Sequence, residues 1–311
     1  MKTYSKASSF DAKIPTVITI GTFDGVHIGH RKIIERLVNS AKESNYQSAL
    51  LTFFPHPRMV LQQNADLRLI NTIDERKNIL ASTGLEHLII HPFTRAFSRL
   101  TAQQYVEEFL IEKLNAKKII IGYDHRFGRN RTADISDLKK YADQFNFEVE
   151  EISKQDIEDV GISSTKIRTA LEDGEVEKAN RYLASNFLLT GEVVRGKGMG
   201  KGFGYATANI LIKEDYKLIP KKGVYIVQSN INGVYQNGMM NIGTNPTVGG
   251  TQQTIEIHFL DFDKDLYGQH LQIEVLQRIR GEVNFDSVEH LKVAMKKDEL
   301  YTRDYFKSNT K

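Results

Sequence analysis

The chain has 311 residues, of which 40% are hydrophobic and 26% are charged. This length and ordinary composition predict two globular domains and exclude a largely disordered protein. There is no cysteine and the net charge is only +3, which excludes disulfides and thiolate chemistry and argues against a dedicated nucleic-acid binder.

The first half of the chain, up to about residue 182, alternates short apolar runs with amphipathic helical segments. Its first thirteen residues are polar and no apolar run approaches about 20 residues, so we expect a cytoplasmic protein without a membrane anchor. Capping boxes at Thr72–Glu75 and Thr101–Gln104 predict two helix starts, and Gly84 is a suitable end for the first helix. The alternation predicts a parallel sheet covered on both faces, in a Rossmann-like α/β domain. Its expected strands are Thr16–Gly21, Ser48–Phe54, His87–His91, Lys118–Gly122 and Phe147–Ile152.

The second half, after about residue 186, has short strands separated by turn residues, which predicts an antiparallel β-barrel. In Thr254–Phe262, apolar residues at every second position alternate with polar ones, as in a half-buried strand. Asn232-Gly233 predicts a hairpin turn between the strands Val224–Ser229 and Val234–Met239. A terminal helix is expected from about Ser287 to Tyr305. We expect the domains to span residues 1–184 and 185–311, abutting through Ala184–Leu189.

One glycine-rich segment follows an expected strand and opens an expected helix, where unpaired amides and the helix dipole favour an anion. Three glycines let the backbone approach a phosphate, and two histidines three residues apart can reach the same side of it. The pattern fits the triphosphate of ATP. A metal site and a simple helix cap stay open as alternatives, with His56 as the one obvious third imidazole. The segment is Gly21-Thr22-Phe23-Asp24-Gly25-Val26-His27-Ile28-Gly29-His30.

Further polar residues of the first half could serve a nucleotide. Ser163, Ser164 and Thr165 can bind phosphate or only cap the helix that they open. Arg168 comes one turn after Ser164 and is placed to hold β- and γ-phosphate oxygens. Two carboxylates at strand ends, Asp24 and Asp124, can steer Mg²⁺ or the ribose. His56 stands between two prolines, so a structural role is as plausible there as a flavin contact.

The second half has its own glycine-rich stretch, with six glycines between residues 191 and 204 beside Arg195, Lys197 and Lys201. Such a loop can wrap phosphates with its amides, although it lacks the Gly-Lys-Ser/Thr ending of a P-loop. A flexible hairpin is the structural alternative.

Four segments of the first half resemble motifs of the FAD synthetase module of bacterial bifunctional riboflavin kinase/FMN adenylyltransferases. They are Gly21–His30, with the His-x-Gly-His of nucleotidylyltransferases, and Thr52–Pro57, Gly122–Gly128 and Ile162–Arg168. In the second half, Gly204-Tyr-Ala-Thr-Ala-Asn209 resembles the riboflavin kinase signature Gly-Phe-Pro-Thr-Ala-Asn. Further similar segments are Gly223–Tyr225, Asn241–Thr247, Ile255–Phe262, Asp265–Gly268 and Arg278–Glu282.

The resemblance implies that the C-terminal domain phosphorylates riboflavin to FMN with ATP and that the N-terminal domain adenylylates FMN to FAD with release of pyrophosphate. It implies Mg²⁺ as cofactor, FMN as intermediate and FAD as product. The implied partners are riboflavin, FMN and ATP, with no nucleic acid and no membrane, and we expect a monomer or weak homo-oligomer.

The resemblance also assigns residues to each activity. Adenylyl transfer uses His27, His30 and Arg168 as catalytic residues, and Glu256 is the catalytic base of the kinase. His56 and Arg280 border the flavin, although Arg278 or a simple surface ion pair could account for the charge at Arg280. The implied ATP-binding residues of the adenylyltransferase are Gly21, Thr22, Phe23, Asp24, Gly25, His27, His30, Asp124, Ser164, Thr165 and Arg168. Those of the kinase are Gly196, Lys197, Gly198, Gly200, Lys201, Thr207 and Asn209, of which Thr207 and Asn209 ligate Mg²⁺.

The chain departs from the family pattern at four positions. His125 stands where an aromatic residue is usual, Tyr205 and Ala206 replace Phe and Pro, and Lys201 stands near a usual arginine. The departures in the second half leave open an enzyme with only the first half active. A separate alternative is a nucleic-acid- or flavin-binding regulator that uses Arg195, Lys197 and Lys201 to contact a phosphodiester backbone. For Glu256, the alternative to a catalytic base is an ordinary exposed strand glutamate.

Overall fold

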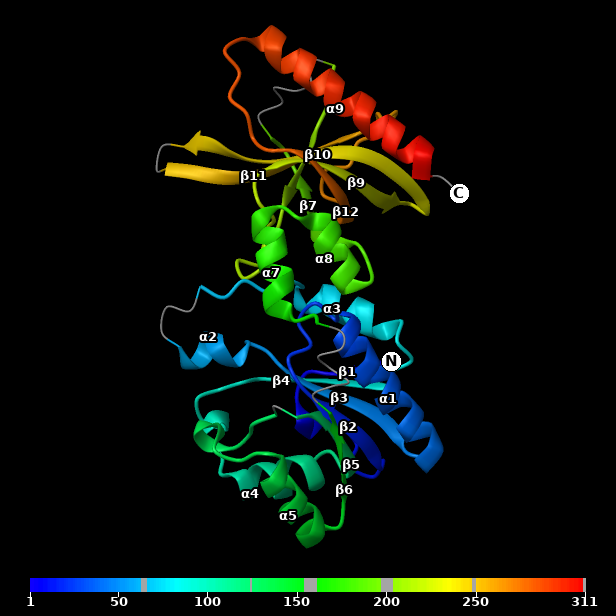
Figure 1. Ribbon diagram of the computed structural model, residues 1–311, viewed down its shortest axis with the longest axis vertical. Helices are drawn as coiled ribbons and strands as arrows, with labels where there is room; N and C mark the ends of the chain where they lie inside the picture. Colours follow the sequence, from blue (N-terminus) through cyan, green and yellow to red (C-terminus); the bar gives the residue numbers. More distant parts are fainter. Residues whose placement is uncertain (63–65, 124, 154–160, 197–203, 248–249, 310–311) are drawn as a thin grey trace. The chain divides into compact units, whose positions relative to one another are not determined.

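The computed structural model describes residues 1–62, 66–123, 125–153, 161–196, 204–247 and 250–309 (Figure 1), with the backbone alone for 245–247 and 250–252. The chain divides into two compact units, Met1–Ser164 and Thr165–Lys311. The boundary between the two units lies about 20 residues before the predicted domain boundary, so the segment 165–184, expected in the first domain, falls in the second unit. The predicted domain boundary after residue 184 stays a prediction.

The first unit contains a six-stranded sheet with the strand order β1-β4-β3-β2-β5-β6, and all its neighbouring strands are parallel. The predicted parallel sheet is therefore confirmed. The short edge strand β1, which pairs with β4, was not expected from its polar sequence. The strands are β1 (Lys2–Tyr4), β2 (Thr16–Ile20), β3 (Gln47–Phe53), β4 (His87–His91), β5 (Ala116–Gly122) and β6 (Glu148–Ile152).

Helices cover both faces of this sheet, with one apolar core on each face. One core joins Val17, Leu50 and Ile120 of the strands to Leu37 of α1 and Leu80 of α3. The other joins the opposite strand faces to η3 and α5. The helices are η1 (Ala7–Ser9), α1 (Ile28–Ser44), α2 (Pro57–Leu61), α3 (Ile73–Ala81), η2 (Phe97–Arg99), α4 (Ala102–Gln104), η3 (Tyr105–Ile111), η4 (Arg129–Arg131) and α5 (Ile135–Phe145).

Both predicted capping boxes are present. The Thr72 hydroxyl accepts from the Glu75 amide at 3.1 Å, and the Glu75 carboxylate accepts from the Thr72 amide at 2.9 Å. Thr101 and Gln104 form the same reciprocal pair at the start of α4. Helix α3 ends at Ala81, and Gly84 lies in the turn that follows, with φ of +81°. Beyond α4 the helix widens into the π-helical η3, which the sequence pattern did not indicate.

The second unit contains a closed six-stranded antiparallel barrel with the strand order β10-β11-β8-β7-β12-β9, as predicted. The alternation after Thr254 is confirmed, because Ile255, Ile257 and Phe259 are buried while Glu256 and His258 are partly exposed. Asn232 and Gly233 both have positive φ in the β9–β10 hairpin, also as predicted. The strands are β7 (Phe187–Val194), β8 (Ala208–Leu211), β9 (Gly223–Ile231), β10 (Val234–Thr247), β11 (Gly250–Phe259) and β12 (His270–Arg280).

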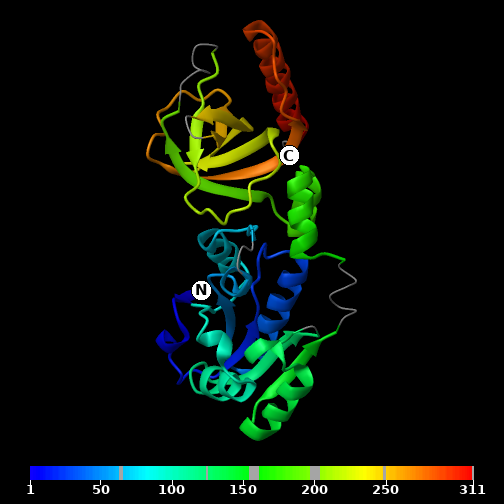
Figure 2. The same cartoon turned by 90° about the vertical axis from the view of Figure 1, so that its left-hand side faces the viewer.

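Three helices accompany the barrel: α7 (Ser164–Asp173), α8 (Val176–Leu183) and the terminal α9 (Val288–Asn309). Asn180 of α8 donates to the Val275 carbonyl at 2.9 Å and accepts from the Phe187 amide at 2.8 Å. Helix α9 runs beside the barrel (Figure 2) and is joined to β12 by the Arg280–Asp298 ion pair. Among the residues that the model describes, no helix has both the length and the apolar content to cross a membrane.

Candidate functional site

The β2–α1 loop, residues 21–27, leaves the sheet at the carboxyl end of β2 and opens α1. Its backbone is left-handed at three positions, Phe23 (φ +48°), Gly25 (φ +89°) and Val26 (φ +41°). Glycine adopts positive φ freely, whereas a β-branched residue such as valine does so only at a cost. Strained backbone of this kind persists where the surroundings hold it, and it gathers at functional sites.

A buried ion pair lies under the β2–α1 loop. The Asp24 carboxylate, only 1% exposed, accepts from the amides of Ile70 and Asn71 at 3.1 and 3.2 Å. It also accepts from the guanidinium of Arg76 at 3.3 Å, and Arg76 donates to the Thr22 carbonyl at 2.8 Å. The carboxylate of Asp24, a predicted ATP-binding residue, therefore ties the β2–α1 loop to the backbone just before α3.

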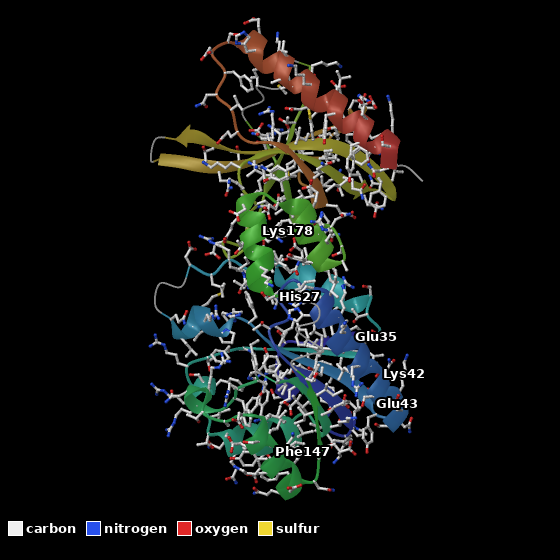
Figure 3. The ribbon with its side chains drawn as sticks, in the orientation of Figure 1. His27, Glu35, Lys42, Glu43, Phe147 and Lys178 are labelled. Carbon is white, nitrogen blue, oxygen red and sulfur yellow. The ribbon has the colours of Figure 1, made fainter. Side chains whose placement is uncertain are left out.

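His27 lies at the start of α1 (Figure 3), and His30 meets it there, as the sequence predicted. His27 is the N-cap, and its Nδ1 accepts from the His30 amide at 3.4 Å. The two rings stack with centroids 3.7 Å apart. A side-chain carbon at Gly29 would lie 3.3 Å from the His27 ring, so glycine gives the ring room. The two imidazoles thus stand at the positive end of a long helix, where an anion is favoured.

Both imidazoles are neutral at pH 7. Burial lowers the pKa of His27 to about 4, against a smaller opposing effect of Asp24. The pKa of His30 lies well below its usual value because of burial, with His27 and Arg76 adding to the effect. Since Nδ1 of His27 accepts a hydrogen bond, its proton sits on Nε2, which is a donor. His30 Nδ1 is buried and has no hydrogen-bond partner among the described residues.

These histidines make the first unit acid-sensitive. His91, like His27, has a pKa lowered to about 4, mainly by burial. An unfolded histidine binds its proton near pH 6.5, so between pH 6.5 and 4 the unfolded chain takes up protons that the folded chain does not. The contribution of these neutral histidines to the free energy of unfolding is therefore fully present above pH 6.5 and is lost as the pH falls toward 4. His27 alone contributes about 2 kcal/mol of this loss at pH 5.

Amide hydrogen exchange of β2 to β5, corrected for its intrinsic pH dependence, measures the effect. We expect less protection at pH 5 than at pH 7. His27→Asn, which keeps a helix cap and removes one titrating ring, should flatten the dependence. Equal protection of the wild type at both values would contradict the lowered pKa values.

The other predicted residues of the first half occupy different places. The Ser164 hydroxyl donates to the Asp24 backbone carbonyl at 2.9 Å, which ties the start of α7 to the β2–α1 loop. Thr165 is exposed and Arg168 partly buried on α7, within the second unit. His56 caps α2, its Nδ1 accepting from the Arg58 amide at 3.1 Å. Asp124 lies outside the described residues, and its role stays a prediction.

A basic hollow of about 490 Å³, which the sequence did not reveal, opens at the carboxyl edge of the sheet. Arg95, Arg99 and Arg129 line it from the loops after β4 and β5, and none pairs with a carboxylate within the described ranges. Ligands of parallel α/β sheets bind at this edge, and three arginines favour an anionic one. His125, in the loop after β5, has its ring centroid 6.0 Å from that of the buried Phe127.

In the barrel, the structure brings together four predicted kinase residues. Thr207 Oγ1 donates to Glu256 Oε2 at 3.4 Å, and Asn209 on β8 lies directly across from Glu256 on β11. A side-chain carbon at Gly196 would lie 2.1 Å from Asn209 Nδ2, so only glycine fits there. On the other side Asn241 of β10 pairs with Glu256 in register. We call Gly196, Thr207, Asn209, Asn241 and Glu256 the Glu256 cluster. Asn241 lies in one of the segments that resemble the family, but the sequence analysis gave it no role.

Because residues opposite each other in antiparallel strands share a face, the side chains of Asn209, Glu256 and Asn241 stand side by side. They present a carboxylate and two amides at the outer face of the barrel. Lys197, Gly198, Gly200 and Lys201, also predicted for this site, lie outside the described residues. Their contribution stays a prediction.

The terminal helix α9 completes this side of the barrel. The Tyr205 hydroxyl donates to Glu299 at 3.0 Å, and burial raises the pKa of Tyr205 to about 12, so it stays protonated. This bond uses the hydroxyl that distinguishes Tyr205 from the phenylalanine of the family pattern. Tyr205 and His258 also line an open hollow of about 590 Å³. Arg280, predicted to border the flavin, pairs with Asp298 of α9 at 2.7 Å.

Comparisons with known proteins agree with this arrangement. The FAD synthetase family model matches residues 10–166 and the riboflavin kinase model residues 183–306. A Listeria monocytogenes protein named bifunctional riboflavin kinase/FMN adenylyltransferase is 37% identical, covering 94% of this chain and 93% of that protein. The protein of that name from Escherichia coli is 34% identical, covering 93% and 92%.

A solved structure is similar over the whole chain. The crystal structure of a Streptococcus pneumoniae protein, called there a macrolide-efflux protein, has a TM-score of 0.87 at 32% identity and covers 97% of this chain and 98% of its own. The efflux name is not carried over, because both halves of this chain match models of flavin enzymes.

Proposed function

The chain belongs to the family of bifunctional riboflavin kinase/FMN adenylyltransferases, and we propose that the Glu256 cluster and the β2–α1 loop are its two active sites. It converts riboflavin to FMN and FMN to FAD. The observation that supports the assignment best is the grouping of Gly196, Thr207, Asn209 and Glu256, because residues 60 positions apart in the sequence meet as a phosphotransfer site requires.

In the kinase site, Glu256 is the general base. The ribityl 5′-hydroxyl oxygen attacks the γ-phosphorus of ATP, the bond from that phosphorus to the β-phosphate oxygen breaks, and ADP leaves. The hydroxyl proton passes to the Glu256 carboxylate. Asn209 and Asn241, on either side of Glu256, donate amide hydrogens to phosphate or substrate oxygens. Arg280, held by Asp298, borders the flavin.

The residues present fit a magnesium ion. Thr207 and Asn209 would hold it through a hydroxyl and an amide oxygen, which are the hard donors that Mg²⁺ prefers. When bound, the ion neutralises charge on the phosphates of ATP. No group of three His, Cys, Asp or Glu side chains in the described part of the chain could hold a metal. The two proposed ligands are uncharged oxygens, and the phosphates of ATP would supply the negative charge.

In the adenylyltransferase site, the FMN phosphate attacks the α-phosphorus of ATP and pyrophosphate leaves, so no protein nucleophile is needed. The protein aligns the reactants and stabilises charge on the phosphates. The Nε2–H of His27 and the ring of His30 act on the triphosphate at the start of α1. Arg168, which the sequence places one turn after Ser164, holds the departing pyrophosphate. The cytoplasmic location and the monomeric or weakly oligomeric state remain predictions.

A time course tests the proposal. Incubated with ATP and Mg²⁺, riboflavin is expected to give FMN first and FAD later, both resolved by chromatography. Conversion of added FMN to FAD without any FMN or FAD from riboflavin would remove the kinase assignment. Binding of DNA or RNA without ATP turnover would instead favour the regulator considered from the sequence.

A further inference from the structure

Arg76 is the most deeply buried cation among the described residues, with 2% of its surface exposed. Its guanidinium donates to the Thr22 carbonyl at 2.8 Å and to the Asp24 carboxylate at 3.3 Å. It thus bonds to residues on both sides of Phe23, the first left-handed residue of the β2–α1 loop.

The loop needs such an anchor. Three of its residues have positive φ, including a phenylalanine and a valine, for which other conformations cost less. The Asp24 carboxylate is buried, and a buried negative charge is costly unless a positive charge lies beside it. Arg76 supplies the balancing charge and a planar fork that contacts a carbonyl and a carboxylate at once.

We propose that Arg76 is a positioning residue for adenylyl transfer, which holds the β2–α1 loop ready to receive the triphosphate of ATP. The inference rests on the adenylyltransferase site proposed above. A loop that is free to relax occupies its binding conformation only part of the time, and the apparent affinity for ATP falls by that fraction. Arg76 therefore acts on ATP binding, whereas His27 and His30 act on the phosphates themselves.

Arg76→Lys tests the proposal. Lysine keeps the charge beside Asp24 but cannot bond to both oxygens with one planar group. We expect the KM for ATP in FMN adenylylation to rise about tenfold, with kcat within about threefold of the wild type. Arg76→Met should raise this KM further. The matched control is Arg36→Lys, which alters an exposed arginine paired with Glu150 and should leave both constants unchanged.

Riboflavin phosphorylation by the same molecules reports whether they are folded, and it should stay at the wild-type rate. An unchanged KM for ATP in Arg76→Lys would overturn the proposal, as would a fall in kcat at constant KM. If Arg76→Met does not fold, the lysine variant still decides. A wild-type protein that fails to adenylylate FMN would refute the proposed site itself, which separates the two failures.

Discussion

Replacing Glu256 by glutamine is expected to lower kcat for riboflavin phosphorylation by about 1,000-fold, while FMN adenylylation stays at the wild-type rate. Glutamine has the same shape and its amide oxygen can still accept from Thr207, so the cluster keeps its packing. It cannot take the proton of the ribityl hydroxyl. The drop in kcat therefore reports the missing general base and not a change in folding.

Formation of FMN under saturating ATP, followed by chromatography, gives this number. Glu192→Gln is the matched control, because Glu192 is a strand glutamate of the same barrel that pairs with Lys213 at the surface. It should leave both activities unchanged. A Glu256→Gln protein that forms FMN at nearly the normal rate would place the base elsewhere. Loss of both activities in a folded variant would argue against separate sites.

Replacing His30 by alanine is expected to lower the rate of FAD formation from FMN by about 100- to 1,000-fold and to spare riboflavin phosphorylation. The His30 backbone amide, which bonds to His27, is unaffected by the substitution. The loss therefore reflects the missing ring beside the triphosphate. A single-turnover assay with excess enzyme separates this chemical step from product release.

His27→Asn is the companion variant. Asparagine is a good helix cap, so α1 keeps its start, but the Nε2–H donor is gone. We expect a loss of FAD formation similar to that of His30→Ala. His87→Gln is the control: it changes a buried histidine that bonds to Tyr4 and Gln47, and FAD formation should persist. Normal FAD formation by the His30 variant would remove this loop from the chemistry.

Local patterns predicted most of the fold because the apolar runs, capping boxes and hairpin turn each determine short stretches of chain. The short strand β1 was not predicted, because Lys2–Tyr4 is polar and only its pairing with β4 makes it a strand. The π-helical η3 was not predicted either, because an amphipathic pattern does not distinguish the i→i+5 hydrogen bonds of a π-helix from the i→i+4 bonds of an α-helix.

The site was predicted where glycine and histidine spacing is local, as in the β2–α1 loop. Arg76 could not be found this way. It lies in the charged run Asp74-Glu75-Arg76-Lys77, which is typical of a solvent-exposed helix face, yet Glu75 and Arg76 are both buried. Their burial depends on Asp24 and the capping box, and so on tertiary structure. Likewise, the partnership of Arg280 with Asp298 depends on where α9 docks, which no local spacing determines.

The central claim is that two independent sites in one chain act in sequence on the same flavin. Mixing the Glu256→Gln and His30→Ala proteins with riboflavin, ATP and Mg²⁺ tests it most directly. Each variant alone should make little FAD from riboflavin. Together they should restore FAD formation, because FMN released by the His30 variant is adenylylated by the Glu256 variant. A mixture that accumulates FMN and forms no FAD, although each protein is folded, would contradict the assignment.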